Sequence, residues 1–279
     1  MRSATYSAPT EFKEIRLQNC HLAYKDSPIR GCYVPHKPAT LQSPPRVCST
    51  SLHKEVCSVA STDLSSSLRT RRQQTARAAT IALVTVAYFA VIIVVLHFLR
   101  ADLNPISTPT SEYAVGRYGF LMSSAFFSMS LGSFALVIGL NRGVSKRARS
   151  GIGLVLLGIW AVGVLIAMSF PIDPEGAPQT ISGTIHRING PLAFLSLTAG
   201  TILVSRRFKQ DRLWRPIHRS AVILSLVMLT AFIANFVNIA TASGFGGLCQ
   251  RVFLVAFVTW FVLTAARLRS ISSRSVRSR

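Results

Sequence analysis

Acidic residues are scarce in this sequence. Of its 279 residues, 10 are Asp or Glu against 31 Lys or Arg, which gives a formal net charge of +21. Charged residues make up only 15% of the chain and apolar residues 49%, a balance that soluble domains of this length rarely have. The basic residues are divided among a long N-terminal stretch and short gaps, without the interleaved aromatic residues that stack nucleic-acid bases. We therefore expect a membrane protein and no nucleic-acid partner.

Motifs that are typical of metal and hydrolytic sites are also missing. The sequence contains no Cys-x-x-Cys, no His-x-x-x-His and no nucleophile elbow, the spacings that bring such side chains together. Cys32 with His36 and His53 with Cys57 have a spacing that zinc accepts, but little apolar sequence surrounds them. No pair of histidines lies at mid-membrane depth, where a haem would need it. The sequence therefore predicts no metal site and no cofactor.

Six apolar runs are long enough to cross a membrane. A spanning helix needs about 20 residues of low charge, because the hydrocarbon layer is about 30 Å thick. Backbone groups in lipid must be paired within the segment, and the short alternating strands of a barrel are absent. The sequence predicts an all-α polytopic membrane protein, a bundle of six transmembrane helices over residues 79–268. The six runs are Ala79–Leu99, Gly119–Leu140, Gly151–Phe170, Gly190–Val204, Ser220–Ala242 and Gly247–Ala266.

Basic residues gather on alternate sides of these runs. They precede the first, follow the second and fourth, and form a basic tail at 269–279, whereas the gaps 100–118, 171–189 and 243–246 hold few. Because basic loops stay in the cytoplasm, both termini are predicted to be cytoplasmic. Each basic residue near anionic lipid gains about 1 kcal/mol. We therefore expect membrane lipids as partners, with anionic headgroups at Arg206, Arg207, Arg212 and Arg215.

Residues 1–78 differ from the rest in composition. They are rich in Ser, Thr, Pro and Arg and show no helical or alternating periodicity, which predicts a disordered basic tail. No apolar core follows the first residue, and acidic residues weaken a mitochondrial presequence. The pattern favours a plasma or cell membrane over an organelle. A second hypothesis is a biological start nearer Leu64 or Leu68, which the intact mass would decide.

The polar stretch between the third and fourth runs holds the first candidate site. Asp173 and His186 lie on either side of a proline-rich loop that we place on the outer face. An acid beside a histidine would supply the general acid–base pair of a membrane-embedded hydrolase, and these two are the candidate catalytic residues. The alternative is that the prolines and Gly176 only turn the chain, while His186 contacts solvent.

Six further residues are candidates for ligand binding at the same mouth of the bundle. Arg251 lies about one turn inside the last run, where it would pair with an outer acid, Asp173 or Glu112, or extend to the surface. Asn235 and Asn238 are three residues apart and share a helix face that we expect to point into the bundle, where hydrogen bonds between helices are the alternative to a ligand. The full set is Arg251, Gln250, Asn235, Asn238, Glu112 and Arg117.

Three short motifs resemble those of a known family. "FPIDPEGAPQTISGTIH", "GLCQR" and "STPTSEY" are similar to segments of the six-helix membrane proteins catalogued as domain of unknown function 998. The resemblance covers about residues 79–268. It implies an integral six-helix fold with no established activity, substrate or cofactor, and it matches Asp173, Gly176, His186, Gln250 and Arg251.

The sequence leaves the biochemical role open among three classes. A hydrolase acting on lipid would use Asp173 and His186. A small-solute transporter would be built from two three-helix halves, but residues 79–170 and 188–266 show no similarity and no charge lies at mid-depth. A non-catalytic scaffold would hold lipid through its basic loops. Whether the protein is an enzyme, and its oligomeric state, stay undetermined at this level.

Overall fold

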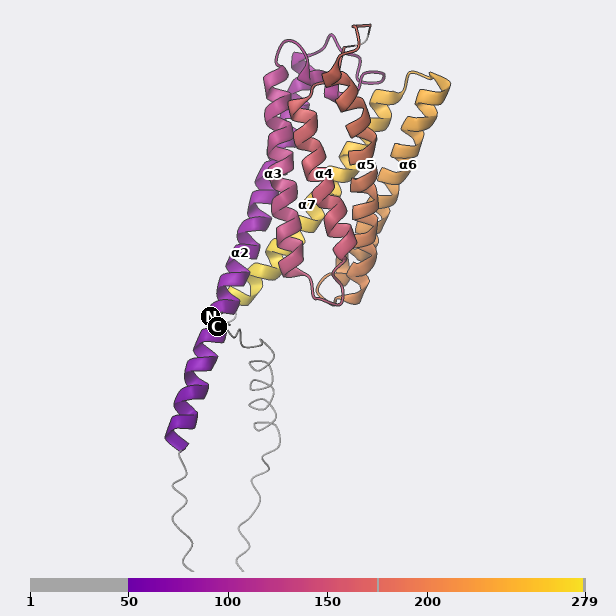
Figure 1. Ribbon diagram of the computed structural model, residues 1–279. Helices are drawn as coiled ribbons and strands as arrows, with labels where there is room; N and C mark the ends of the chain where they lie inside the picture. Colours follow the sequence, from indigo (N-terminus) through magenta and orange to yellow (C-terminus); the bar gives the residue numbers. More distant parts are fainter. Residues whose placement is uncertain (1–49, 175, 278–279) are drawn as a thin grey trace, which may run out of the picture. The chain divides into compact units, whose positions relative to one another are not determined.

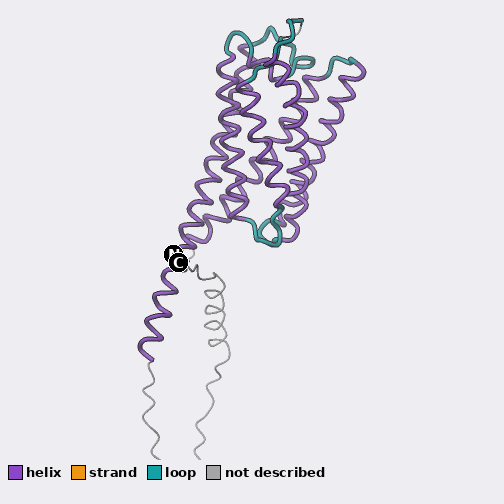
Figure 2. The backbone as a smooth tube through the Cα atoms, viewed as in Figure 1, coloured by secondary structure: helices purple, strands orange, loops and turns teal. Residues whose placement is uncertain are grey.

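The regular structure of this protein is helical. A computed structural model describes the backbone of residues 50–174 and 176–277 and the side chains of 66–174 and 176–273. Within these ranges every regular element is a helix (Figures 1 and 2), which confirms the predicted all-α class. The long helices are α2 (Thr50–Leu99), α3 (Gly119–Gly143), α4 (Gly151–Ser169), α5 (Ile181–Arg207), α6 (His218–Thr241) and α7 (Gly246–Arg277). Short 3-10 turns, η1 (Thr110–Ala114), η2 (Phe208–Gln210) and η3 (Arg215–Ile217), lie in the connections.

All six long helices are apolar and long enough to cross a membrane, as predicted. The described part of the chain is therefore a multi-pass membrane protein. Many large apolar side chains point outward, among them Phe98 at 80% exposed and Ile152 at 72%. Lipid, rather than water, is the medium that such a surface fits.

The first and last helices extend beyond the predicted spans. Helix α2 begins at Thr50, so it includes residues 50–78, which composition assigns to the N-terminal tail. Both helix propensity and packing against the bundle explain this extension. Arginine, glutamine and alanine before Ala79 are good helix formers, and Thr75 is buried close to α3. Residues 1–49 of the predicted tail lie outside the described residues.

Helix α7 also extends beyond the last predicted span. It continues to Arg277, into the predicted basic tail at 269–279. Leu268 is fully buried and Ser272 nearly so, at 0% and 7% exposed. The last turns of α7 thus still contact the bundle, because Leu268 fills the space beside Gly139 and Gly143 of α3.

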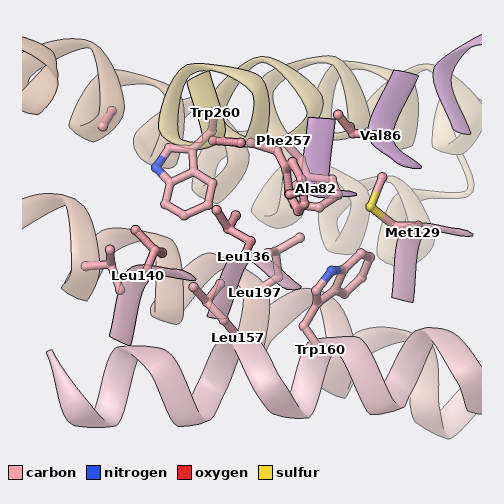
Figure 3. Packing of buried hydrophobic residues seen from close by; sticks show 14 of the residues in the cluster. Ala82, Val86, Met129, Leu136, Leu140, Leu157, Trp160, Leu197, Phe257 and Trp260 are labelled. Atoms are coloured by element: carbon pink, nitrogen blue, oxygen red, sulfur yellow. The ribbon is translucent and has the colours of Figure 1, made fainter. Parts of the chain in front are cut away.

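Aromatic side chains from α4 and α7 meet in the core (Figure 3). The rings of Trp160 and Phe257 lie edge to face with centroids 5.2 Å apart. Two buried indole N–H groups of this core are paired, because Trp160 donates to Ser133 Oγ at 3.2 Å and Trp260 donates to Ser205 Oγ at 2.8 Å. A buried indole without a partner would be costly, so these bonds fix how α3, α4, α5 and α7 sit together.

Helices α4 and α5 approach each other through small residues. A Cβ built on Gly163 of α4 would lie 2.7 Å from the Cβ of Ala193 on α5. Beside this contact, Asn189 donates from Nδ2 to the carbonyl oxygen of Gly163 at 2.8 Å. Close approach of small residues is the usual way that helices pack in lipid. The close packing of α4 and α5 fixes the position of α5, which carries His186.

The connections form two groups at opposite ends of the bundle (Figure 2). One group, with the last turns of α7, we call the basic end; it comprises 144–150 and 208–217. The other, the loop end, comprises 100–118, 170–180 and 242–245. At the basic end the two connections touch, since Ser145 N donates to Asp211 Oδ2 at 3.2 Å. That the basic end lies on the cytoplasmic side of the membrane stays a prediction from its charge.

Candidate functional site

The connection between α2 and α3 is fastened to the beginning of α7 at the loop end. The N–H of Gly247 donates to the carbonyl oxygen of Ser107 at 3.1 Å, and that of Leu248 donates to Ile106 at 2.8 Å. First-turn N–H groups have no partner inside their own helix, and here the loop supplies one. A Cβ on Gly247 would lie 2.5 Å from the carbonyl oxygen of Thr108. Only glycine therefore lets the loop come this close.

Arg251 ties the same loop to α2 and α7. Its Nε donates to His97 Nε2 at 2.8 Å, and its Nη2 donates to the hydroxyl of Tyr113 at 2.9 Å. Its Nη1 donates to the carbonyl oxygens of Thr108 at 2.8 Å and Gly247 at 3.1 Å. All three nitrogens of the guanidinium thus have acceptors. We call His97, Tyr113, Thr108 and Arg251 the Arg251 network.

The protonation of His97 follows from this geometry. A guanidinium nitrogen only donates, so His97 Nε2 is the acceptor and carries no proton. Its Nδ1 then bears the hydrogen and donates to the carbonyl oxygen of Ile93 at 2.6 Å. The ring also lies edge to face with Tyr113, with centroids 5.3 Å apart. A neutral imidazole completes the Arg251 network.

Arg251 has partners other than the acids proposed from sequence. Among the described contacts it forms no hydrogen bond with Asp173, and it does not extend to the surface alone. Glu112 lies in η1, where its carbonyl oxygen accepts from Val115 N at 3.1 Å. The sequence did hold a signal for the observed pair. His97 and Arg251 each lie about one turn inside the same end of an apolar run, and hence at the same depth.

Asp173 and His186 are held by different partners. Asp173 accepts from Thr180 N at 2.9 Å and from Thr180 Oγ1 at 2.6 Å. Thr180 is the N-cap of α5 and accepts from Gly183 N at 3.0 Å, so Asp173 supports the cap. His186 donates from Nδ1 to the carbonyl oxygen of Phe170 at 2.8 Å. No hydrogen bond joins Asp173 to His186 among the described residues, and their catalytic role stays a prediction.

The cap makes stability depend on acidity. Hydrogen bonds from the Thr180 side chain and then its N–H lower the pKa of Asp173, so the carboxylate stabilises the fold above the pKa of the unfolded chain. That contribution disappears as the pH falls through the lower folded pKa, below about 4. Asp173→Asn should therefore flatten the acid side of a curve of melting temperature against pH. An unchanged curve would show that Asp173 is not linked to folding.

A cavity of about 190 Å³ lies near the loop end between α5, α6 and α7. Helix α6 borders α5 and α7 at the edge of the bundle (Figure 1). Phe236 and Ile239 of α6 line the cavity and are 47% and 66% exposed, so its mouth faces the lipid side. Its apolar lining includes Phe194, Ala231, Phe232, Phe236, Ile239 and Phe253, and its polar lining includes Ser111, His186, Arg187, Asn235, Cys249 and Gln250.

A smaller cavity of about 60 Å³ lies deeper in the bundle. Phe89, Met129 and Trp160 line it, so its walls come from α2, α3 and α4. The two cavities share lining residues, which makes their common wall one side chain thick. These shared residues are Ser111, His186, Gly190, Phe194 and Gln250.

Two polar side chains of that wall have hydrogen-bonding atoms to spare. Because His186 Nδ1 donates to Phe170, the neutral ring offers an acceptor at Nε2. Gln250 Oε1 accepts from Thr110 N at 2.6 Å and Thr110 Oγ1 at 3.0 Å, which leaves its amide N–H groups. Among the described contacts neither His186 Nε2 nor Gln250 Nε2 has a partner. One acceptor and one donor are thus available in the cavity wall.

The remaining predicted binding residues lie apart from each other. Asn235 lines the cavity. Asn238, on the same helix, instead closes the turn to α7, because its Oδ1 accepts from Phe245 N at 2.7 Å. Arg117 is exposed, with its guanidinium 5.0 Å from the centroid of the Tyr118 ring. The structure therefore brings Asn235, Gln250 and His186 to one cavity and leaves Asn238 and Arg117 outside it.

The predicted headgroup residues are exposed at the basic end. Arg206, Arg207, Arg212 and Arg215 surround the stacked rings of Phe208 and Trp214, whose centroids are 4.6 Å apart. Both aromatic rings are fully buried. This stack anchors the short connection after α5. We call the four exposed arginines at the end of α5 and in this connection the rim arginines.

The comparison with known proteins agrees with this architecture. The chain belongs to the family described as protein of unknown function (DUF998), whose model matches residues 69–267. No curated protein and no solved structure matches the chain. The family establishes the membrane-embedded helical domain and assigns it no biochemical role.

Proposed function

We propose that this protein binds an amphipathic, lipid-like molecule in the cavity between α5, α6 and α7. The observation that carries the proposal is the composition of the wall: aromatic and aliphatic side chains, with His186 and Gln250 at the loop end. Ligand sites are typically apolar with a few polar groups that orient the ligand. The exposed Phe236 and Ile239 at the mouth suit a ligand that enters from the membrane rather than from water.

The polar atoms of the wall suggest the headgroup. His186 Nε2 would accept a hydrogen bond from a hydroxyl, and the amide of Gln250 would donate to a hydroxyl or carbonyl oxygen. Among the described residues no acid lines either cavity, and Arg187 is the charged side chain at the larger one. A cationic headgroup would meet no counter-charge from these lining residues. The best match is an uncharged or anionic headgroup that carries a hydroxyl.

Binding is supported better than hydrolysis. A hydrolytic pair would need Asp173 within reach of His186, and Asp173 instead accepts two hydrogen bonds from Thr180. Asp173 is also absent from the lining of both cavities. We place the protein in a plasma or cell membrane with the loop end outward, on the strength of the charge distribution. The ligand would then come from the outer leaflet.

Filling the cavity tests the proposal. Gly190 lies in the shared wall, and a Cβ there would meet nothing within 4 Å, so Gly190→Leu occupies space without straining the backbone. We expect it to weaken binding of a fluorescent single-chain glycerolipid to the full-length protein in micelles by about tenfold, because a filled pocket excludes the chain. Fluorescence anisotropy would give the Kd.

Gly158→Leu is the matched control. Gly158 is also a helical glycine whose Cβ would meet nothing within 4 Å, but it lies on α4 away from both cavities. Its Kd should equal that of the unmodified protein. An unchanged Kd in Gly190→Leu, or an equal loss in both variants, would contradict the proposal.

A further inference from the structure

A cleft of about 550 Å³ lies at the basic end, at the opposite end of the bundle from the cavity between α5, α6 and α7. It is formed where residues 68–75 of α2 meet the end of α3 and residues 267–272 of α7. Among the described residues, four arginines line it: Arg71, Arg72, Arg142 and Arg267. Their helices are separate in sequence, so only the fold brings them together.

Neutral groups hold two of these arginines in place. Arg142 donates from Nη1 to Gln74 Oε1 at 3.0 Å, and Arg267 donates from Nε to the carbonyl oxygen of Leu213 at 2.7 Å. An amide and a peptide carbonyl orient a guanidinium without cancelling its charge. No acidic residue lines the cleft in the part of the chain whose side chains the structure describes.

The acid of the adjoining loop is already engaged. Asp211 accepts from Ser145 N at 3.2 Å and from Leu213 N at 2.9 Å, so it shapes the connection beside the cleft. Convergent guanidinium groups repel each other unless an anion lies between them. Arginine is also the side chain best suited to bind phosphate, since its planar fork donates two parallel hydrogen bonds.

The apolar residues of the cleft indicate where that anion is attached. Leu68, Leu213 and Ile271 line the same cleft as the arginines. The cleft therefore lies at the level where the apolar spans end, which in a bilayer is the layer of phosphate headgroups. A soluble anion would contact only the arginines, whereas a phospholipid would contact both the arginines and the apolar side chains.

We propose that this cleft binds the phosphate group of an anionic phospholipid, between Arg71, Arg142 and Arg267. The site differs from the rim arginines, which are exposed at the end of α5 and in the connection that follows it. It also differs from the cavity between α5, α6 and α7 at the opposite end of the bundle. It requires no particular outcome at that cavity.

Paired charge removals test the cleft. The full-length protein in uncharged micelles would be titrated with dioleoyl phosphatidic acid, and the Kd would be read by native mass spectrometry. Arg71→Gln with Arg142→Gln should raise the Kd by about tenfold or more, because charge-assisted hydrogen bonds to phosphate are lost. Arg206→Gln with Arg212→Gln removes the same charge from the rim and should change the Kd by less than about threefold. Equal losses in both pairs would overturn the proposal.

A steric variant separates binding from folding. Ser270 also lines the cleft, and Ser270→Trp fills it while keeping every charge. It should weaken phosphatidic acid binding as the arginine pair does, at an unchanged melting temperature. Undiminished binding in this variant would refute the site. Glycerol 3-phosphate serves as the soluble comparison. If it bound as tightly as phosphatidic acid, the proposal that the bound phosphate belongs to a phospholipid would be refuted.

Discussion

Replacing Arg251 with methionine is expected to lower the free energy of unfolding by about 2 to 4 kcal/mol, because hydrogen bonds to a charged group each contribute about 1.5 to 3 kcal/mol and those between membrane helices less. Arg251 donates to His97, Tyr113, Thr108 and Gly247. Methionine keeps much of the apolar stem and removes every one of these bonds. The connection from α2 to α3 would lose the bonds of Thr108 and Tyr113 to α7.

The measurement is unfolding of the purified protein by titration with dodecyl sulfate, followed by tryptophan fluorescence. Arg117→Met is the control, since Arg117 is exposed and rests over the neighbouring Tyr118 ring; it should cost less than about 0.5 kcal/mol. Arg251→Lys should fall between the two, because one ammonium cannot reach all the acceptors of a planar fork. If Arg251→Met were as stable as the control, the Arg251 network would not contribute to folding.

Two glycines of α4 should respond in opposite directions to the same substitution. Gly163→Ala places its methyl group 2.7 Å from the Cβ of Ala193, whose position is fixed by the α5 backbone, so it cannot rotate away. Overpacking of this kind costs about 1 to 3 kcal/mol, and separating the helices also strains the bond from Asn189 to Gly163. Gly158→Ala meets nothing within 4 Å and should stabilise by about 0.5 to 1 kcal/mol, because alanine is the better helix former.

The same titration gives both values in one detergent. The difference between the two variants should be about 1 to 3 kcal/mol, since the helix-propensity gain is common to both and only Gly163 adds the clash. Circular dichroism would confirm that each variant remains helical. Stabilisation by Gly163→Ala would mean that α4 and α5 do not pack closely at this position. It would contradict the placement of α5, and of His186 on it, in this structure.

The apolar runs predicted the helices well because the signal is local. Each run is a property of about 20 consecutive residues, and the six spans all coincide with helices. The ends were less predictable. Helix α2 extends before Ala79 and α7 beyond Leu268, since a helix that leaves the lipid continues while its residues favour it and its neighbours cover it.

The candidate site was predicted in part. Gln250, Asn235 and His186 do line one cavity, as expected of residues near the same mouth. Asp173 was predicted to act together with His186, and the structure shows it accepting a hydrogen bond from Thr180, seven residues along the chain. A cap of this kind is a local feature that could have been expected from an acid ahead of a threonine at a helix start.

The sequence by itself determined the class of this protein: six apolar helices, alternating basic and nearly neutral connections, and membership of a membrane family. Those features depend on run length and charge, which are additive along the chain. Only the tertiary structure decided that Arg251 meets His97 across 154 positions, that four arginines converge at the basic end, and that His186 faces a cavity. Such contacts depend on how each helix is rotated and how closely small residues let it approach its neighbours. In lipid, where apolar faces point both inward and outward, the hydrophobic pattern does not specify that rotation.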